Sequence, residues 1–337
     1  MLKSMVRRLL GAILDHRPLP PPSTREKCLA SELQATFCEL QVSDSADALP
    51  SEATWLSNTN RLRELVLSRD PRRFLRWDVV TRTMFVSAGR FVSTELDYLK
   101  HRPDWHTRWR TAIEESPVGG PLPYILYPAS SGNLITHAYH VAQFEDRTGV
   151  QVNDLDYVFE FGGGYGSMCR LFCNLGFRGK YVIFDLPAFS ALQRYYLGAL
   201  GLPVHSAAEF VGFATGIACV SDAQELADVL TDHVDTTGNM FVATWSLSES
   251  PIGIRDSILP LVSEFQSFLI GYQDRFGEVN NVEFFDGWKQ TIGNVAWHGW
   301  RIEHLPGNSY LVGRVAPDSW PLVAVEPASG LSGIVRL

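Results

Sequence analysis

The chain has 337 residues, of which 45% are hydrophobic and 20% are charged, and its formal net charge is −8. This length fits one catalytic domain of about 170 to 200 residues with a smaller second domain, and the composition is that of a globular protein. The acidic balance disfavours a nucleic-acid partner, which calls for a basic surface. No apolar run approaches the roughly 20 residues of a membrane span, so no transmembrane segment is expected.

The first 17 residues are predicted to form an amphipathic basic helix. Apolar side chains recur over residues 1–14, with Lys3, Arg7 and Arg8 between them. Such a helix either contacts a membrane surface or packs on the protein's own body or on a second subunit, which would make a homodimer. The run Pro18–Pro22 then acts as a stiff linker.

Residues 18–128 are predicted to form a helical N-terminal domain. Helical periodicity runs through Thr24–Leu40, Thr54–Leu67 and Asp78–Leu99. Such a domain serves either as a lid over a binding site or as a dimerisation surface, and the pattern does not separate the two.

Residues 129–316 alternate between strand and helix patterns, which predicts an α/β catalytic domain. The domain begins with the helix Asn133–Asp146, and a tail, residues 317–337, follows it. Parallel strands joined by helices and closed by a hairpin predict a doubly wound, Rossmann-like, seven-stranded and mostly parallel sheet. The predicted strands are Tyr157–Phe161, Lys180–Phe184, Gly216–Val220, Met240–Thr244, Ser267–Tyr272, Trp297–His304 and Tyr310–Val315.

A glycine-rich loop joins the first predicted strand to the helix that follows it. The glycines are Gly162, Gly163, Gly164 and Gly166, and the next strand ends at Asp185. Glycines let a chain turn sharply and let a ligand lie against the backbone, and a carboxylate after the second strand can accept both hydroxyls of a ribose. The unit therefore predicts a nucleoside-type ligand.

The glycine spacing separates two classes of nucleotide cofactor. A dinucleotide fingerprint, G-x-G-x-x-G, would need a third glycine where Ser167 stands. The sequence has E-x-G-x-G-x-G instead, beginning at Glu160, which resembles motif I of class I S-adenosylmethionine-dependent methyltransferases. The resemblance implies that Glu160 lies beside the methionine part of S-adenosyl-L-methionine, that the glycines face this cofactor, and that Asp185 binds its ribose. The alternative is a glycine-rich turn in a purely structural α/β unit.

Further motifs resemble the bacterial sugar O-methyltransferase family. They span most of the chain: F-L-R-W at 74–77, S-G-N-L-I at 131–135, W-S-L-S-E at 245–249 and H-L-P-G-N-S-Y-L at 304–311. The resemblance implies a class I methyltransferase fold and transfer of a methyl group to a hydroxyl of a sugar or glycan precursor, either free or linked to a nucleotide or lipid.

Ligands in doubly wound sheets bind at the carboxyl ends of the strands, and this rule selects further cofactor candidates. They follow the second, third and fourth strands, and are Leu186, Ser221, Asp222 and Trp245. Asp222 is placed to meet an adenine amino group, although a helix N-cap explains an aspartate there equally well.

The acceptor side of the site draws its candidates from polar side chains. The substrate candidates are His137, Ser246, Ser248, Gln273 and Arg275, and the base candidates are His304, His140 and Glu249. Methyl transfer to a hydroxyl requires removal of its proton, and a histidine with a near-neutral pKa suits that task. Packing, helix capping and surface solvation are the alternatives. No aspartate-rich cluster is evident, so no metal is expected; the alternative is a metal held where the two helix histidines and Glu249 converge.

The sequence thus predicts a cytoplasmic S-adenosylmethionine-dependent O-methyltransferase. The cytoplasm is favoured by five cysteines, an odd number without C-x-x-C spacing, which suggests free thiols. The rivals are the same chemistry on a non-sugar small molecule, a cofactor-binding scaffold without catalysis, and a nicotinamide-dependent dehydrogenase, which Ser167 disfavours.

Overall fold

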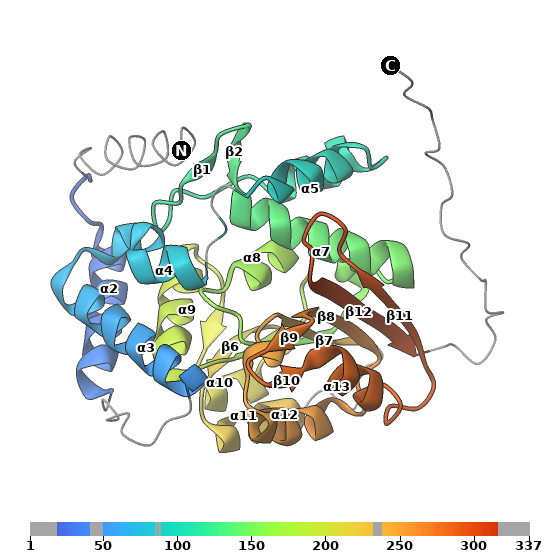
Figure 1. The fold of residues 1–337 in the computed structure, drawn as a ribbon. Coiled ribbons are helices and arrows are strands. Elements are labelled where there is room, and N and C mark those ends of the chain that lie inside the picture. The colour runs from blue at the N-terminus through green and yellow to red at the C-terminus, as the bar shows by residue number, and fades with distance from the viewer. Residues whose placement is uncertain (1–18, 41–49, 85, 87–88, 232–237, 316–337) are drawn as a thin grey trace.

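A central sheet lies between two layers of helices, with further helices against one side (Figure 1). The computed structural model describes residues 19–40, 50–84, 86, 89–231 and 238–315. The predicted basic helix at the N-terminus and the C-terminal tail lie outside these ranges. None of the described helices combines the length and the apolar character that a membrane crossing needs.

The central sheet has eight strands in the order β11-β12-β8-β7-β3-β4-β6-β5. Neighbouring strands pair in parallel, except that β12 runs antiparallel to both β8 and β11. The strands are β3 (Tyr157–Phe161), β4 (Lys180–Phe184), β5 (Val204–His205), β6 (Gly216–Val220), β7 (Asn239–Thr244), β8 (Ser267–Gln273), β11 (Val295–Arg301) and β12 (Asn308–Val315). The predicted doubly wound, mostly parallel sheet is confirmed, but the strand count of seven was wrong. The additional strand, β5, has only two residues and so leaves no pattern in the sequence.

Among the described residues, the α/β unit contains ten helices, beginning with α7. They cover both faces of the sheet, and alternate residues of a strand pack against the helices on opposite faces. They are α7 (Gly132–Thr148), η3 (Val152–Asp154), α8 (Ser167–Asn174), α9 (Pro187–Ala199), α10 (Ala207–Gly212), α11 (Ala223–Leu230), η5 (Leu247–Glu249), α12 (Ile252–Ile258), η6 (Leu259–Val262) and α13 (Asn281–Trp288). In β3, Val158 packs in the core shared with α7, α8 and α9, whereas Tyr157 and Phe159 pack in the core shared with α10 to α13. This alternation follows from the two-residue period of a strand.

The N-terminal segment is helical, as predicted, up to two short hairpin strands. It contains α2 (Thr24–Glu39), α3 (Pro50–Ser68), η1 (Pro71–Arg76), α4 (Asp78–Thr83), α5 (Phe91–Lys100), η2 (Trp105–Trp109) and α6 (Arg110–Ala112), followed by β1 (Pro123–Tyr124) and β2 (Tyr127–Ser131). A second small hairpin, β9 (Arg275–Phe276) with β10 (Val279–Asn280), follows β8. The single helix expected over Asp78–Leu99 is two helices, because β-branched residues fill the end of α4 and Gly89 precedes α5.

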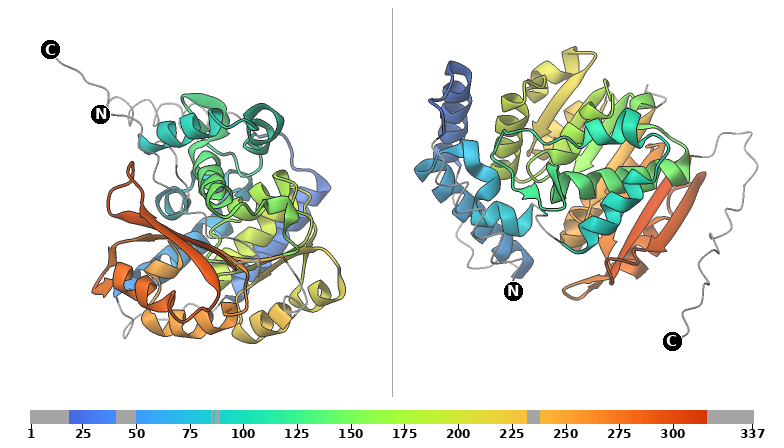
Figure 2. Two further views of the ribbon diagram at one scale, coloured as in Figure 1. Left: turned by 90° about the vertical axis from the view of Figure 1, so that its right-hand side faces the viewer. Right: turned by 90° about the horizontal axis from the view of Figure 1, so that it is seen from above.

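Helix α2 packs closely on α9 of the α/β unit, as the view from above shows (Figure 2). Gly198 permits this approach, since a Cβ on it would stand 3.2 Å from a methyl group of Leu29. Arg25 donates to the carbonyl of Gly198 over 2.9 Å, and the Trp55 ring meets Phe189 edge-on at 5.8 Å. The N-terminal helices are therefore packed directly on the α/β unit.

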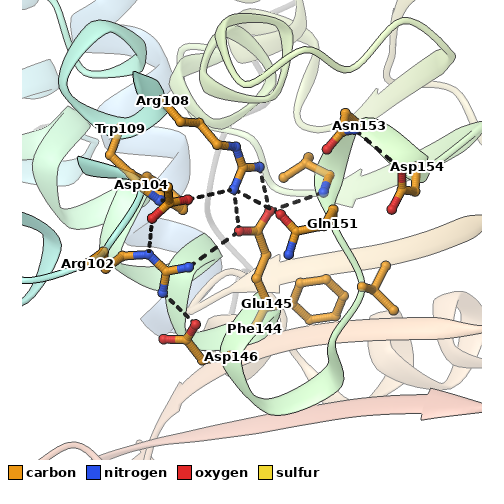
Figure 3. Close-up of polar contacts among 12 residues, drawn as sticks. Arg102, Asp104, Arg108, Trp109, Phe144, Glu145, Asp146, Gln151, Asn153 and Asp154 are labelled. Carbon is orange, nitrogen blue, oxygen red and sulfur yellow. Dashed lines mark hydrogen bonds and ion pairs between the residues drawn. The ribbon is translucent and has the colours of Figure 1, made fainter. Parts of the chain in front are cut away.

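A partly buried ion-pair network, centred on the buried Glu145, fastens α7 to the segment before it (Figure 3). The Glu145 side chain is fully buried and accepts two hydrogen bonds from Arg108, of 2.6 and 2.7 Å. Arg102 pairs with Asp146 at 2.5 Å and with Asp104 at 3.3 Å. Because α7 also carries His137 and His140, the network fixes the helix that supplies these side chains to the site.

Candidate functional site

A cleft of about 890 Å³ opens at the carboxyl ends of β3, β4 and β7, where the sheet topology places a ligand. Its lining combines the loops after these strands with the first half of α7. The N-terminal segment closes one side of the cleft with Trp55, Leu56 and Thr59 from α3, Arg82 and Thr83 from α4, and Met84.

Three of the four loop glycines line the cleft, and two of these have left-handed backbones. Gly162 has a φ of 73° and Gly164 a φ of 57°. A Cβ on Gly162 would stand 2.2 Å from Cβ of Ser246, and one on Gly163 would stand 2.5 Å from Ile183. Gly166 lies outside the lining, where it precedes α8 with a φ of 92°. The loop is thus shaped by backbone conformation and by close approach of its neighbours.

Asp185 joins the glycine loop to the start of α9. Its Oδ2 accepts hydrogen bonds from the Gly164 N–H over 3.0 Å and from the Gln193 amide over 2.9 Å, while Oδ1 accepts from the Leu186 N–H over 2.8 Å. Burial raises the pKa of the Asp185 carboxyl to about 7, although these hydrogen bonds oppose the rise. Gln193 was not among the predicted residues, since nothing in its local sequence points across to the loop.

Glu160 lies at the floor of the cleft, beneath the glycine loop. It is 3% exposed, and its Oε2 accepts a hydrogen bond from the Tyr181 hydroxyl over 2.9 Å. Burial raises the pKa of Glu160 to about 8, and the nearby Asp185 charge adds to the rise. The loop, the buried Glu160 and the half-buried Asp185 form a cradle with two acids. A cationic ligand group would favour both carboxylates in ionised form.

Two histidines of α7 also line the cleft. His140 is buried, and its Nδ1 contacts the hydroxyl of Tyr310 in β12. Burial lowers the pKa of His140 well below its ordinary value and that of His137 to about 4. Both rings are therefore uncharged at neutral pH, and the near-neutral pKa expected of a histidine base is not found in the ligand-free chain. Nδ1 of His137 has no hydrogen-bond partner among the described residues.

The loop after β7 completes the lining. Trp245 has a left-handed backbone with a φ of 66°, an uncommon conformation for a bulky residue and one that concentrates at functional sites. The Ser246 hydroxyl donates to the carbonyl of Phe161, which ties this loop to the glycine loop. Burial raises the pKa of Glu249, whose side chain also lines the cleft.

A buried arginine that the sequence did not single out holds this same loop. The Arg255 guanidinium donates to the carbonyls of Ser248 and Ser250, over 2.7 and 3.0 Å, and to the Asn281 side chain over 2.7 Å. Ser248, a predicted substrate residue, is itself buried, and its Oγ lies 2.7 Å from the Trp245 carbonyl oxygen and 2.8 Å from Gln273 Oε1. Its hydroxyl is thus engaged within the protein.

Several predicted residues lie outside the cleft lining: Gly166, Asp222, Ser248, Gln273, Arg275 and His304. Asp222 caps α11 by accepting from two backbone N–H groups, while Ser221 beside it does line the cleft. Gln273 stands behind Glu249, 3.5 Å from its carboxylate, and Arg275 is exposed in the small hairpin strand β9.

His304 does not end a strand as expected, because β11 stops at Arg301 and His304 lies in the turn before β12. Its Nε2 is 3.3 Å from the buried carboxylate of Glu95 in α5. The neighbouring Leu305 is the residue of this turn that lines the cleft. Within the described residues, no group of three or more histidine, cysteine or acidic side chains could hold a metal ion.

Neither the family models nor the curated proteins compared with this chain match it. Solved structures that align with it include the precorrin-6y C5,15-methyltransferase of Geobacter metallireducens, at 13% identity and a TM-score of 0.33 over 55% of this chain and 88% of that one. The methyltransferase domain of bacterial CtHen1 aligns at 11% identity and a TM-score of 0.38, over 55% of this chain and 99% of that one. The N-terminal domain of human METTL16 in complex with SAH aligns at 8% identity and a TM-score of 0.36, over 53% of this chain and 70% of that one.

The strand order, with one reversed strand between β8 and β11, is that of the class I methyltransferase fold. The chain has this fold. The likeness to the solved structures is too low to say anything of its substrate.

Proposed function

We propose that the protein is an S-adenosylmethionine-dependent O-methyltransferase that acts on a hydroxyl of a sugar or glycan precursor. One observation carries the proposal. The glycine loop, Glu160 and Asp185 line a single cleft together with the uncharged His137 and His140. The first group suits the methyl donor and the second suits a hydroxyl acceptor.

The cradle fits the donor in charge and in shape. Gly164 lines the cleft with no side chain of its own, so a ligand at the backbone there would meet only the flexible Met84 side chain. Asp185 is already oriented by three hydrogen bonds and would accept hydrogen bonds from the ribose hydroxyls. Glu160 would accept hydrogen bonds from the ammonium group of the methionine part. The bound cofactor supplies an electrophilic methyl group on a sulfonium.

The acceptor side would orient a hydroxyl and remove its proton. His140, unprotonated at neutral pH, would take that proton at Nε2 as the hydroxyl oxygen forms its bond to the methyl carbon and the carbon–sulfur bond breaks. Glu249 is the second base candidate, since it lines the same cleft and has a raised pKa. Positioning of the two reactants in line supplies much of the rate.

The N-terminal helices would act as a wall or lid of this site. Met84 packs over the glycine loop, with its Cγ 3.4 Å from where a Cβ on Gly164 would stand. Trp55 and Leu56 face the cleft from α3. These apolar side chains also favour a second acceptor class, a non-sugar small molecule with an aromatic or aliphatic body.

Transfer of a labelled methyl group from S-adenosylmethionine tests the proposal. The acceptor panel holds free sugars, nucleotide-sugars, lipid-linked glycans and phenolic small molecules. Label in a sugar-containing acceptor supports the proposal, and label only in a phenol supports the second acceptor class. Tight S-adenosylhomocysteine binding without transfer to any acceptor would favour a cofactor-binding scaffold.

His140→Gln separates the two base candidates in the same assay. If His140 is the base, this variant should lower the rate of methyl transfer about a hundredfold or more. Glu249→Gln is the matched variant. Unchanged transfer by His140→Gln together with loss in Glu249→Gln would move the base role to Glu249.

A further inference from the structure

Trp245 has a strained backbone at the end of β7, and its side chain lines the cleft. A bulky residue keeps a left-handed backbone only where its surroundings hold it there, and such residues cluster at binding sites. The Trp245 N–H donates to the Gly271 carbonyl over 2.6 Å, and the Glu249 N–H donates to the Trp245 carbonyl over 3.1 Å. The backbone is therefore fixed on both sides of this residue.

The Trp245 side chain is held as firmly as its backbone. Its indole N–H, which can only donate, forms a hydrogen bond of 2.6 Å with Oδ1 of Asn308 in β12. Gly271 in β8 leaves room for the ring, since a Cβ there would stand 3.0 Å from it. The ring also packs on that of His140, with 5.1 Å between the ring centres. It is thus oriented in the ligand-free chain, although Trp245 is only half-buried.

The strand order places this ring away from Asp185 along the sheet. Asp185 follows β4, the glycine loop follows β3 and Trp245 follows β7, whereas Gly271, against which the ring lies, belongs to β8. Three strand spacings separate β4 from β8, which is roughly 14 Å. The ring is therefore displaced from the acid expected to hold the ribose, and it lies next to the base candidate His140.

We propose that the Trp245 indole is a platform on which the acceptor stacks a flat ring, and that Asn308 is the positioning residue that holds this platform. Trp245 then belongs to the acceptor, and not to the cofactor as the sequence suggested. The face of an indole is apolar and carries partial negative charge, so it packs on the C–H groups of a sugar ring or of a phenol. A ring stacked there would present a hydroxyl to His140. The inference rests on the proposed function, in which His140 takes the proton of the acceptor.

Fluorine NMR on the full chain, labelled with 5-fluorotryptophan and saturated with S-adenosylhomocysteine, reports on the ring directly. Trp245→Phe identifies the Trp245 signal. Methyl glycosides of glucose, galactose, mannose and rhamnose, and phenol, are then added one at a time. A sugar acceptor should shift the Trp245 signal with at least one glycoside, and the second acceptor class should shift it with phenol. The Trp297 signal is the matched control and should not move, because Trp297 packs on Phe268 and lies outside the cleft lining.

Kinetics of the transfer assay test the platform and its support together. Trp245→Ala should raise the acceptor KM about tenfold or more, with little change in kcat and none in S-adenosylhomocysteine affinity. Trp245→Phe should recover part of this loss. Asn308→Leu should raise the acceptor KM in the wild type but have no further effect in Trp245→Phe, which has no indole N–H to hold. Equal effects of Asn308→Leu in both backgrounds would refute the positioning role of Asn308.

The outcomes separate this inference from the proposed function. A Trp245 signal that shifts with S-adenosylhomocysteine alone, and with none of the ring compounds, would overturn the inference and return Trp245 to the cofactor. Transfer with an unchanged acceptor KM in Trp245→Ala would sink the platform and leave the proposed function standing. A Trp245 signal that shifts with a glycoside, without methyl transfer to any acceptor, would support the platform and count against the proposed function.

Discussion

The Gly164 N–H donates a hydrogen bond of 3.0 Å to the carboxylate of Asp185, so the acid expected to hold a ribose also holds the glycine loop. Gln193 supports the same carboxylate over 2.9 Å and donates to the Gly164 carbonyl as well. The loop after β3 and the end of β4 are thus hydrogen-bonded to each other in the ligand-free chain.

Asp185→Ala should lower S-adenosylhomocysteine affinity about ten- to hundredfold, because it removes both a charged hydrogen-bond acceptor and the support of the loop. Gln193→Ala should cost less, since it loosens the loop and leaves the carboxylate in place. Calorimetric titration measures both. Asp222→Ser keeps the helix cap of α11 and should not change the affinity; a loss there would restore Asp222 as an adenine contact.

Gly162→Ala should destabilise the protein more than Gly149→Ala does. Both glycines have similar left-handed backbones, with φ of 73° and 71°, so each variant incurs backbone strain of about 1–2 kcal/mol. Only at Gly162 does the new methyl group collide with a neighbour, Ser246, whereas no heavy atom lies within 4 Å at Gly149. Denaturant unfolding compares the two, and equal losses would mean that the loop can move away from Ser246.

Glu160→Gln should stabilise the ligand-free protein as the pH rises. The pKa of Glu160 is about 8 in the folded chain and near the ordinary 4.5 when unfolded, so the folded state binds the extra proton between these values. The stability that protonated Glu160 contributes is fully present below the unfolded pKa, and it is lost as the pH rises through the folded pKa. Glutamine resembles the protonated acid but does not titrate, so the variant does not lose this stability as the pH rises. The difference in Tm between variant and wild type should widen from about pH 5 to pH 8, and a constant difference would refute the buried, protonated state.

Glu145→Ala should destabilise the protein strongly, by about 3–5 kcal/mol, since it leaves the Arg108 guanidinium without its buried partner. The matched control is Glu64→Ala, which removes the exposed pair with Arg61 at 2.6 Å and should cost no more than about 1 kcal/mol. Urea unfolding followed by circular dichroism measures both losses. Similar small losses would show that the network in Figure 3 is not a principal fastening of α7.

The central strands could be read from the sequence because each is a short apolar run with glycine or charged residues at its ends. Tyr157–Phe161, Lys180–Phe184 and Gly216–Val220 were predicted with the bounds that β3, β4 and β6 have. The two-residue β5 could not be read, since it is too short for any period to appear. The loop glycines, Glu160 and Asp185 could also be located, because one local motif carries them all.

The residues that hold the site in place were not predictable, because their contacts join distant parts of the chain. Gln193 reaches back to Gly164, Arg255 reaches forward to Asn281, and Tyr310 meets His140 across 170 positions. His304 was misplaced at a strand end because the apolar pattern of β11 does not show where the strand stops. Packing in three dimensions decides such positions, and no local pattern records it.

Calorimetry of S-adenosylhomocysteine and of NAD with the full chain decides whether the cleft binds a methyl donor. We expect saturable, one-site binding of S-adenosylhomocysteine that Asp185→Ala weakens, and no measurable binding of NAD. Binding of NAD alone, or S-adenosylhomocysteine binding that Asp185→Ala leaves unchanged, would contradict the assignment of this cleft as a methyl-donor site.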